Sequence, residues 1–549
     1  MGQSTMQDRR TFIKGAGAIA AVAAGAAIPA TAFGAYAADH ADPAADLVAM
    51  TAEPTAAPTA TEDGWDGEFD VVIVGAGMAG VCAAITVATE GEGATCLLLE
   101  KEASASGNSP YSAGDVLYCD DASEAEVYLQ NLIGGATPDD VIHAFAVELQ
   151  ENLNWFKSLG MTEDMLYMNP PDPTGEKTME YAEFPNDHTV GYFEFDPEKG
   201  EYYHTYQFLF EALNTHADVV TYLPSTPMEE LIQDPETKTI LGVLAAGKRY
   251  KAKRGVLMCT GGFENDPEMM FTYTGIQGCI PLAGAANTGD GHRACMKIGA
   301  DFWHMHGGAQ FWMTLRDLEN TRFASVKHSF NTKQHGITIG VNGRRFYNDY
   351  DGCNVYKGTA ADSDMSRNVG YRHGITQFGG NWVHLPLPPK GWFIFDQAGL
   401  EAGAFPTDIS EDPVADGWAV SADTIEDLAA AIEVPAEELV KTVDLWNQWC
   451  DQGEDLAFYR PSDTLTPIKT GPFYAILCIP TMLNTDGGPV RSAKGEILDP
   501  DGNPIPHLYS AGEFGSVWGH FYQGCGNLGE CAAFGRISAR SALANEPLA

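Results

Sequence analysis

The chain has 549 residues, of which 44% are hydrophobic and 19% are charged, a balance typical of ordinary globular proteins. Because a chain of this length is too long for one hydrophobic core, two domains are expected. The 75 acidic and 32 basic residues give a formal net charge of −43, which argues against nucleic acid or anionic lipid as a partner.

The N-terminal residues 1–37 have the order of an export signal. Arg9 and Arg10 begin a charged segment, an apolar stretch rich in Ala and Gly runs from 15 to 33, and a small-residue cleavage site follows at 35–37. This order resembles a twin-arginine signal peptide and predicts export across the cytoplasmic membrane. The alternative is a transmembrane anchor, which the weak hydrophobicity of the stretch and its Pro29 disfavour.

Residues 38–67 are rich in Ala, Pro, Thr and Asp without periodicity, which predicts a disordered linker. No later segment reaches about 20 uninterrupted apolar residues, so no stable membrane insertion is expected once the signal is removed. The 11 cysteines lie at irregular spacings, which favours buried free thiols over a disulfide framework or an iron–sulfur cluster. No His, Cys or carboxylate cluster has zinc-like spacing, so no metal is predicted.

The segment 69–100 has the pattern of a dinucleotide-binding turn. A β-branched run at 69–74 predicts a buried strand, and the turn Gly75-Ala76-Gly77-Met78-Ala79-Gly80 follows it directly. A helix at 81–89 and a second strand at 95–99 come next, and this strand ends at Glu100. Gly75 permits the tight turn, Gly77 lets the backbone approach a pyrophosphate, and Gly80 lets the helix pack on the strand. The helix N-terminus would hold the phosphates, and Glu100 the adenosine ribose.

Further motifs are more specific together than any one of them is alone. They are Ser106–Ser109 with Ser112–Gly114, Val256–Phe263, Thr288–Gly291, Gly343–Asp349, Pro504–Glu513, and Gly526–Gly529 with Phe534–Ile537. With the turn at 75–80, they resemble the fumarate reductase-like flavoproteins, a family that includes 3-ketosteroid dehydrogenases and urocanate reductases. The resemblance extends from Glu68 to Leu543 and implies bound FAD, with no nicotinamide site required. The turn and the resemblance together indicate as cofactor-binding residues Gly75, Ala76, Gly77, Ala79, Gly80, Glu100, Lys101, Asn108, Ser109, Ala113, Gly114, Thr260, Gly261, Gly262, Asp290, Glu513, Asn527 and Leu528.

By the same resemblance the fold class is α/β. It implies a Rossmann-like FAD-binding domain that is split in the sequence into residues 68–304 and 482–549, with an inserted α+β capping domain at 305–481 that closes over the flavin. Glycine-rich turns lie at both ends of the chain, where a backbone would have to approach the cofactor. Helical periodicity around 425–431 and 437–449 predicts two helices in the capping domain.

Three positions depart from the fumarate reductases, which by the resemblance clamp a dicarboxylate with arginines and histidines. Cys353 stands where the proton-donating arginine is expected, Asn484 where a histidine is expected, and Gln523 where a carboxylate-binding arginine is expected. A buried carboxylate pair would lose charge-assisted partners worth roughly 1.5–3 kcal/mol each. Fumarate is therefore not the expected substrate.

The stretch Tyr522-Gln523-Gly524-Cys525-Gly526 resembles instead the Tyr-x-Gly-x-Gly of the ketosteroid dehydrogenases. There the Tyr hydroxyl and the amide of the last Gly hold the substrate ketone, although here one residue is missing between Gly526 and Leu528. A phenol and an amide directed at one oxygen would stabilise an enolate and make the β carbon a better hydride acceptor from flavin N5. The alternative is that Tyr522 only packs in the flavin pocket.

The proton for the α carbon requires a positioned acid. Tyr350, Tyr356 and Cys353 lie in the expected stretch, together with Arg344 and Arg345; Tyr350 is favoured, and Arg345 fits the structural arginine of its motif better than a catalytic one. Two histidines, His304 and His306, lie where relatives have one at the junction of flavin and cap, so either one faces the site or both pack at a hinge. His520 either tunes the pocket or lines its rim. The catalytic candidates are Tyr522, Gly526, Tyr350, Cys353, Arg345 and His306.

Three functions remain open on the sequence. The first is an exported FAD-dependent reductase of a C=C bond conjugated to a carbonyl in an uncharged substrate such as a steroid-like, phenylpropenoid or flavonoid enone. Its electrons would come from a separate donor protein, because the chain has no CxxCH haem site. The second is a 3-ketosteroid-type dehydrogenase that runs the reverse reaction, and the third is a flavin electron-transfer subunit without chemistry of its own. Export favours the reductase, and the Tyr522–Gly526 stretch counts against the third function.

Overall fold

The computed structural model describes residues 64–549 except for 105–106, 113, 176–180, 182–183, 197–198, 200–201, 203, 277, 282, 320–334, 347–348, 350–389, 408 and 520. The predicted signal peptide and nearly all of the predicted linker lie outside the described residues. The chain divides into two compact units. The large unit runs from the first described residue to Met269 and adds Ala283–Ala309 and Leu483–Ala549, and the small unit comprises Met270–Leu282 and Gln310–Met482. The segment Met270–Leu282, which the sequence placed in the FAD-binding part, thus belongs to the small unit.

A largely parallel sheet lies at the centre of the large unit and confirms the α/β class. Its parallel strands are, in order, β19 (Pro504–Ser510), β9 (Lys248–Met258), β1 (Gly67–Val74), β2 (Cys96–Leu99) and β6 (Val220–Leu223). At one edge β18 (Glu496–Leu498) pairs antiparallel with β19, while β8 (Ile240–Ala245) and β7 (Met228–Gln233) extend from β9. Val71, Val72 and Ile73 are fully buried, as expected for the continuous apolar run of a parallel strand.

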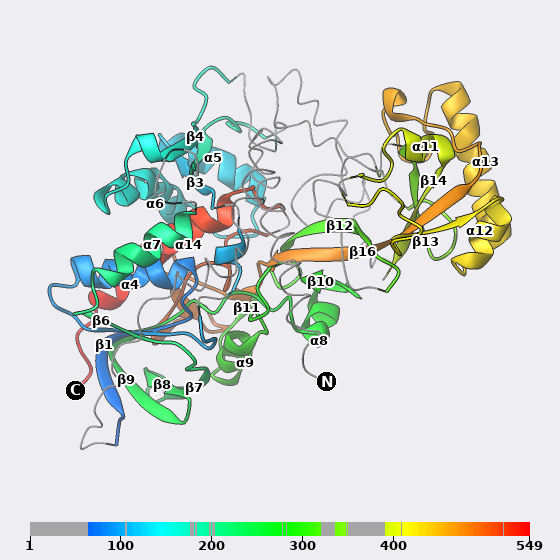
Figure 1. Cartoon of the computed structure of the whole chain (residues 1–549). Helices are drawn as coiled ribbons and strands as arrows, with labels where there is room; N and C mark the ends of the chain where they lie inside the picture. The colour runs from blue at the N-terminus through cyan, green and yellow to red at the C-terminus, as the bar shows by residue number, and fades with distance from the viewer. Residues whose placement is uncertain are drawn as a thin grey trace. The chain divides into compact units, whose positions relative to one another are not determined.

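The last helix of the chain packs against the first helix of the large unit. Figure 1 shows α14 (Gly526–Leu543) beside α4 (Met78–Glu90), which is also in contact with α7 (Thr205–Asn214). Because β19 also pairs with β9, the C-terminal segment completes the sheet that the N-terminal segment begins.

A second, antiparallel sheet of the large unit has the order β3 (Val116–Cys119), β5 (Val190–Phe195) and β4 (Leu166–Asn169). Two helices accompany it, α5 (Ala122–Ile133) and α6 (Asp139–Ser158), which pack on each other. The remaining elements are α9 (Asp290–Lys297), the ladder of β11 (Phe302–Trp303) with β17 (Gly488–Pro489), and the short helices at Ser109–Tyr111, Glu163–Met165 and Pro267–Met269.

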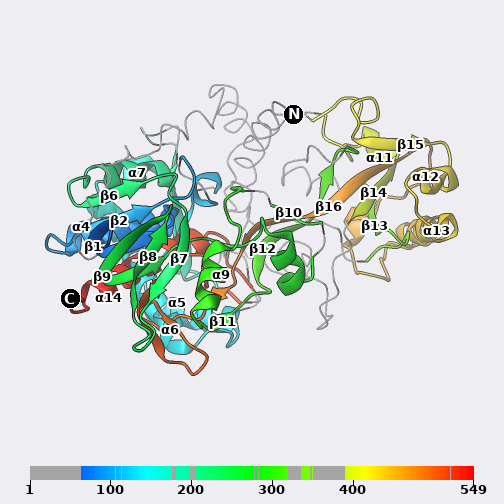
Figure 2. The same cartoon turned by 90° about the horizontal axis from the view of Figure 1, so that it is seen from below.

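The small unit is a mixed sheet, and two of its helices lie together beside it (Figure 2). Its order is β10 (Ile280–Pro281), β16 (Phe473–Thr485), β14 (Gly391–Asp396) and β13 (Ile337–Gly340), with β12 (Gly308–Arg316) and β15 (Ala419–Ala422) also paired to β16. Its helices are α11 (Gln397–Glu401), α12 (Ile425–Ala431) and α13 (Ala436–Gln452), and short turns lie at Met270–Thr274 and Ser462–Thr464. The two helices predicted from periodicity are confirmed by α12 and α13. They pack apolar side chains against the sheet in one core, with Trp446 fully buried.

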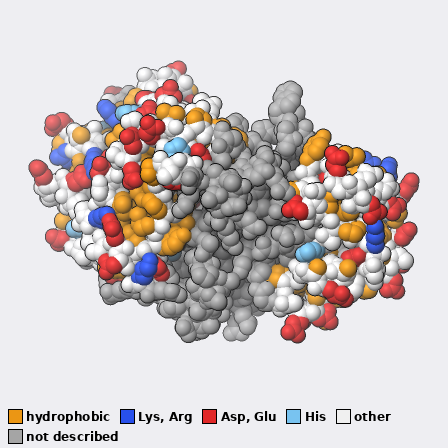
Figure 3. Space-filling model, turned by 90° about the horizontal axis from the view of Figure 1, so that it is seen from above, with side chains coloured by type: hydrophobic (Ala, Val, Ile, Leu, Met, Phe, Trp, Pro, Cys, Tyr) orange, Lys and Arg blue, Asp and Glu red, His pale blue; other side chains and the backbone are white. Residues whose placement is uncertain are grey.

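Acidic side chains are spread over the described surface of both units on the face shown in Figure 3, with fewer Lys and Arg among them. This distribution accords with the formal charge of −43.

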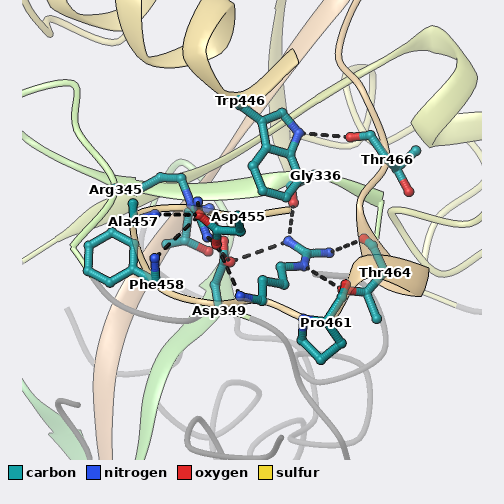
Figure 4. Close-up of polar contacts among 12 residues, drawn as sticks. Gly336, Arg345, Asp349, Trp446, Asp455, Ala457, Phe458, Pro461, Thr464 and Thr466 are labelled. Atoms are coloured by element: carbon teal, nitrogen blue, oxygen red, sulfur yellow. Dashed lines mark hydrogen bonds and ion pairs between the residues drawn. The ribbon is translucent and has the colours of Figure 1, made fainter. Parts of the chain in front are cut away.

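Four buried charges hold the small unit together (Figure 4). The guanidinium of Arg345 binds both carboxylate oxygens of Asp455, at 3.0 and 2.9 Å, and one oxygen of Asp349 at 3.3 Å. Arg460 donates to the same Asp349 oxygen at 3.3 Å and to the carbonyl of Gly336 at 2.8 Å. The four charged side chains are at most 3% exposed. Two cations and two anions therefore compensate one another, and both guanidinium groups lie over the Trp446 ring.

We expect Asp455→Ala to lower the free energy of unfolding by about 3–5 kcal/mol, because it leaves a buried guanidinium without its bidentate partner. The matched control is Asp451→Ala, which removes an exposed ion pair with Lys469 at 2.8 Å and should cost about 0–1 kcal/mol. Urea unfolding followed by tryptophan fluorescence measures both. Equal losses for the two variants would contradict the role given to the buried network.

Candidate flavin and substrate site

In the turn after β1, two of the three glycines have no space for a side chain and the third has. Gly75 has φ +101°, and a side chain there would collide with the carbonyl of Cys259. A side chain at Gly80 would collide with the carbonyl of Gly75, whereas at Gly77 the nearest atom to a Cβ would be the Ser109 hydroxyl at 3.5 Å. The protein thus leaves room at Gly77, where a pyrophosphate would approach the backbone.

The N-terminus of α4 faces this opening. Its N-cap is Gly77, which provides no side-chain cap, and the positive end of the helix dipole lies here, where it favours phosphate. The hydroxyl of Ser109 accepts from the amide of Met78 at 2.9 Å, and a carboxylate oxygen of the buried Glu100 accepts from the amide of Ala76 at 3.1 Å. These bonds fix Ser109 and Glu100 at the turn, where the sequence predicted them.

A group of polar contacts near this turn joins segments that are far apart in the chain. The side-chain amide of Asn108 donates to Glu264 at 2.8 Å and to Glu513 at 3.1 Å, and Asn287 also donates to Glu264 at 2.8 Å. A Cβ at Gly261 would lie 2.6 Å from the Asn287 side-chain oxygen, and one at Gly262 would collide with Thr485 and Glu264. The two glycines are therefore needed so that the backbone can lie against this polar cluster.

Three buried side-chain oxygens at the predicted cofactor positions have no hydrogen-bond partner among the described residues: Asn108 Oδ1, Thr260 Oγ1 and Asn527 Oδ1. A buried polar atom without a partner is costly unless a ligand satisfies it. Together with the open turn at Gly77, these oxygens fit a polar cofactor that runs from the start of α4 to the start of α14. FAD has the hydroxyl and amide groups to satisfy them.

Two predicted cofactor residues bind each other. The ammonium of Lys101 lies 2.7 Å from the Asp290 carboxylate and 2.8 Å from the Thr288 hydroxyl. Gly114 lies beside the buried His204 ring, which a Cβ at Gly114 would approach to 3.4 Å. Ala113 lies outside the described residues. Their predicted contact with the cofactor stays a prediction.

The site is rich in buried carboxyl groups. Glu264, Asp486 and Glu530 are at most 2% exposed, and burial is the main cause that raises their pKa values and that of Glu513. The negative charges of the neighbouring carboxylates raise the pKa values of Asp486 and Glu513 further. Within the described part of the chain one cation, Arg491, pairs with this carboxyl cluster, at 3.1 Å from Glu530.

The hydrogen-bond donors show which of these acids have better stabilised ionised forms. Glu264 accepts from Asn108, Asn287 and Thr485, and Glu530 accepts from Ser516 and the amide of Val517 besides its pairing with Arg491. Asp486 and Glu513 each have one neutral donor among the described residues, Asn484 at 2.9 Å and Asn108 at 3.1 Å respectively. Few donors stabilise the ionised forms of Asp486 and Glu513, which accords with the pKa values of these two acids being raised well above their usual range.

The sequence prediction missed Glu264 and Asp486. For Asp486 a signal was present, because it lies two residues after the noted replacement Asn484 and directly before two glycines. Glu264 had no such signal, because two of its three side-chain partners, Asn108 and Thr485, lie 156 and 221 residues away.

Tyr522 lies in the turn that leads into α14. It is 7% exposed, its hydroxyl accepts from the amide of Asn527 at 3.4 Å, and the Trp518 ring contacts it edge-on at a centroid distance of 5.8 Å. The amide of Gly526, which the sequence paired with this hydroxyl, donates instead to the carbonyl of Gln523 at 2.9 Å. The structure thus brings the Tyr522 hydroxyl to the amide one residue further along.

The two uncharged replacements noted in the sequence make internal hydrogen bonds. Gln523 is fully buried and accepts from the hydroxyl of Tyr128. Asn484 donates to Asp486. Neither residue adds a positive charge to the site, in line with the prediction from the sequence.

The remaining catalytic candidates lie elsewhere or outside the described residues. Arg345 is buried in the ion network of the small unit, as its structural role requires. His306 is half-buried in the loop after β11, and both ring nitrogens of His304 face main-chain carbonyls, of Ser516 at 2.8 Å and of Ala136 at 3.0 Å. His304 therefore packs against the main chain at Ser516 and Ala136. Tyr350, Cys353 and His520 lie outside the described residues, so their predicted roles stay predictions.

This geometry defines a dinucleotide-binding flavoprotein of the α/β class. Residues 70–528 match the family described as FAD binding domain, and the chain belongs to this family. The chain is 28% identical to digoxin reductase of Eggerthella lenta over 98% of this chain and 97% of that protein. It is 26% identical to vinyl phenol reductase of Lactiplantibacillus plantarum over 86% and 95% of the two chains.

Among solved structures, the 3-ketosteroid Δ1-dehydrogenase of Sterolibacterium denitrificans in complex with 1,4-androstadiene-3,17-dione superposes with a TM-score of 0.65 at 22% identity. The match covers 87% of this chain and 99% of the dehydrogenase, and at this identity it shows the fold. The cofactor is FAD and the chain is a FAD-dependent oxidoreductase, which confirms the cofactor and the family predicted from the sequence.

Two searches of the described residues found no candidates. No described helix has the length and apolar content to cross a membrane. No group of three or more described His, Cys, Asp or Glu side chains has the arrangement of a metal site.

We expect Gly77→Ala to fold but to lose bound FAD. The protein leaves room for the added methyl group, so a clash arises only with the pyrophosphate of the cofactor. Gly80→Ala is the contrast, because its methyl group collides with the carbonyl of Gly75 and should lower the melting temperature even without cofactor. The ratio of absorbance at 450 nm to that at 280 nm, and circular dichroism, separate the two effects. Wild-type protein that releases FMN instead of FAD on denaturation would contradict the assignment.

We expect the stability of the FAD-loaded protein to fall as pH rises from about 4 toward 8, and Asp486→Asn to reduce this fall. A carboxyl whose folded-state pKa is raised keeps a proton that the unfolded chain releases above about pH 4, so its contribution is lost as pH rises. The amide cannot ionise, so the variant should gain melting temperature at pH 8 relative to wild type and change less at pH 5.

The control for this experiment is Asp499→Asn. The amide of Asn503 lowers the pKa of the exposed Asp499, so that its ionised form stabilises the fold above about pH 4. This variant should lose melting temperature at pH 8. If Asp486→Asn behaves like Asp499→Asn, Asp486 is ionised in the folded protein.

Proposed function

We propose that this oxidoreductase reduces a C=C bond conjugated to a carbonyl in an uncharged organic substrate. The observation that carries the proposal is the position of the Tyr522 hydroxyl at the amide end of α14, 3.4 Å from the Asn527 amide. A phenol whose oxygen accepts from an amide still has its own O–H to donate, and the amide makes that O–H a stronger donor to a substrate carbonyl oxygen. The dipole of α14 also favours negative charge at its N-terminus.

The roles of the chain's own residues follow from this position. FAD, when bound, would supply the hydride that the β carbon of the substrate accepts. The Tyr522 hydroxyl, polarised by the Asn527 amide, donates to the carbonyl oxygen and stabilises the negative charge that develops there, which lowers the barrier. The α carbon then takes a proton, for which Tyr350 remains the proposed donor.

The electrostatics of the large unit support an uncharged substrate. The four acids of the carboxyl cluster face one arginine among the described residues, and Gln523 and Asn484 add no positive charge. A dicarboxylate such as fumarate would bring two negative charges to this cluster, where the one described cation, Arg491, is already paired with Glu530.

The direction of the reaction is proposed from the relatives. The two relatives named above are reductases, and each is matched over at least 95% of its own length. The reverse reaction, as in a ketosteroid dehydrogenase, uses the same carbonyl contacts, because they stabilise the same enolate.

We further propose that the protein is exported by the twin-arginine route and receives electrons from a separate donor protein. The first part rests on Arg9 and Arg10 with the apolar stretch that follows them. The second rests on the absence of a CxxCH haem site from the sequence. Protease accessibility in intact cells, compared with an Arg9→Lys, Arg10→Lys double variant, tests export.

We expect Tyr522→Phe to lower kcat by about 10²–10³, the usual cost of one donor to a developing oxyanion, with FAD content unchanged. The assay is anaerobic oxidation of reduced methyl viologen with three probes: 1,4-androstadiene-3,17-dione, chalcone and fumarate. Wild type should turn over at least one enone and leave fumarate almost unreacted. Turnover of fumarate on the order of 10–100 per second, typical of good enzymes, would contradict the proposal, and so would an active Tyr522→Phe variant. Oxidation of a saturated ketone with an artificial acceptor, without enone reduction, would assign the reverse direction.

A further inference from the structure

We infer that the buried hydrogen bond between Tyr128 and Gln523 positions Tyr522, which makes Tyr128 and Gln523 positioning residues for the reaction. The inference rests on the proposed function, in which the Tyr522 hydroxyl binds the substrate carbonyl. Tyr128 belongs to α5, almost four hundred residues before Tyr522 in the chain, and no sequence motif singles it out.

Gln523 holds the turn that carries Tyr522 through three of its polar groups. Its side-chain oxygen accepts from the hydroxyl of Tyr128, and its side-chain amide donates to the carbonyl of Gly524 at 3.2 Å. Its main-chain carbonyl accepts from the amide of Gly526 at 2.9 Å. Of these three bonds, the one to Tyr128 ties Gln523 to another element, α5, and so helps to fix where the turn lies.

Tyr128 is suited to this task because α5 is a fixed platform. Both Tyr128 and Gln523 are fully buried. The helix begins at Asp121, whose carboxylate accepts from the amides of Ser123 and Glu124, and ends at Gly134 in the left-handed conformation. It packs on α6, whose Asn152 donates to the carbonyl of Gly529 in α14 at 3.1 Å.

The turn has to be held by such contacts because it contains a residue with a strained backbone conformation. Cys525 has φ +70°, a conformation that disfavours residues other than glycine. The hydroxyl of Tyr181 donates to the carbonyl of Tyr522 at 3.2 Å, and the ring of Trp518 lies beside Tyr522. These contacts hold the main chain and the ring, so loss of the Tyr128 bond would let the hydroxyl shift without releasing the whole side chain.

The experiment is a double-mutant cycle of Tyr128→Phe and Tyr522→Phe in the full, FAD-loaded protein. Tyr128→Phe should lower kcat about 10-fold on the enone probe that wild type reduces fastest, since small misplacements of a catalytic group cost up to about 10²-fold. FAD content should stay at the wild-type level. In the Tyr522→Phe background the same change should alter kcat less than 2-fold, because no hydroxyl is left to position.

A merely structural role gives a different pattern. If Tyr128 only stabilises the fold, Tyr128→Phe lowers activity by the same factor with or without the Tyr522 hydroxyl, and that result overturns the inference. The matched control is Tyr474→Phe, which removes a 2.7 Å hydrogen bond from another buried tyrosine to another glutamine, Gln397, in the small unit. It should leave kcat unchanged.

A second measurement needs no substrate. With 3-fluorotyrosine incorporated at position 522, the ¹⁹F resonance should be one narrow line that shifts and broadens in Tyr128→Phe and is unchanged in Tyr474→Phe. An unchanged line in Tyr128→Phe overturns the inference. If wild type reduces none of the enones but the line responds, the proposed function fails while the positioning of Tyr522 stands. If Tyr522→Phe loses activity and Tyr128→Phe does not, only the present inference fails.

Discussion

The close packing of α14 on α4 is the constraint on which the site depends. A Cβ at Gly535 would lie 2.8 Å from the carbonyl of Ala79, and one at Gly512 would lie 2.9 Å from the Ala79 side chain. Neither glycine can take a side chain without displacing its neighbours, because protein interiors are packed as densely as organic crystals and do not deform continuously. The start of α14 therefore has a fixed position relative to the turn that binds the pyrophosphate, and so do the groups that α14 presents to a substrate. A site on packed helices is also more exact than one on loops.

One described cation, Arg491, pairs with the carboxyl cluster of the large unit, so the other acids of the cluster can act as hydrogen-bond donors when they are protonated. An ionised carboxylate can only accept hydrogen bonds, whereas a protonated carboxyl group can also donate one. Burial and neighbouring charges raise the pKa values of Asp486 and Glu513, and in their protonated forms these acids can offer donors to ligand oxygens without adding negative charge. A cofactor that carries phosphates can then be accommodated because its charge is met at the α4 N-terminus.

How much of the site the sequence predicts depends on how local each feature is. The turn at 75–80 and the acid at Glu100 form one continuous segment, so the spacing of their residues determined their arrangement. The bond of Asn108 to Glu264 and Glu513 joins three separate segments, and only the resemblance indicated two of its members. The Gly526 amide was assigned to the substrate because a motif gives residue types. It does not reveal that the left-handed Cys525 turns this amide toward Gln523.

Cys525 shows how the surrounding structure, and not the turn's own preference, sets the position of Tyr522. A non-glycine residue in the left-handed region costs about 1–2 kcal/mol, and such strain persists only where neighbouring contacts over-determine it. Here the carbonyl of Cys525 accepts from the amides of Leu117 at 3.3 Å and Gly529 at 3.2 Å, and the ring of Trp518 leaves no space for a side chain at Gly526. The free energy that holds the turn thus comes from β3, α5 and α14 together. It follows that residues which never touch a substrate, Tyr128 among them, can govern the reaction through the place they give to one hydroxyl.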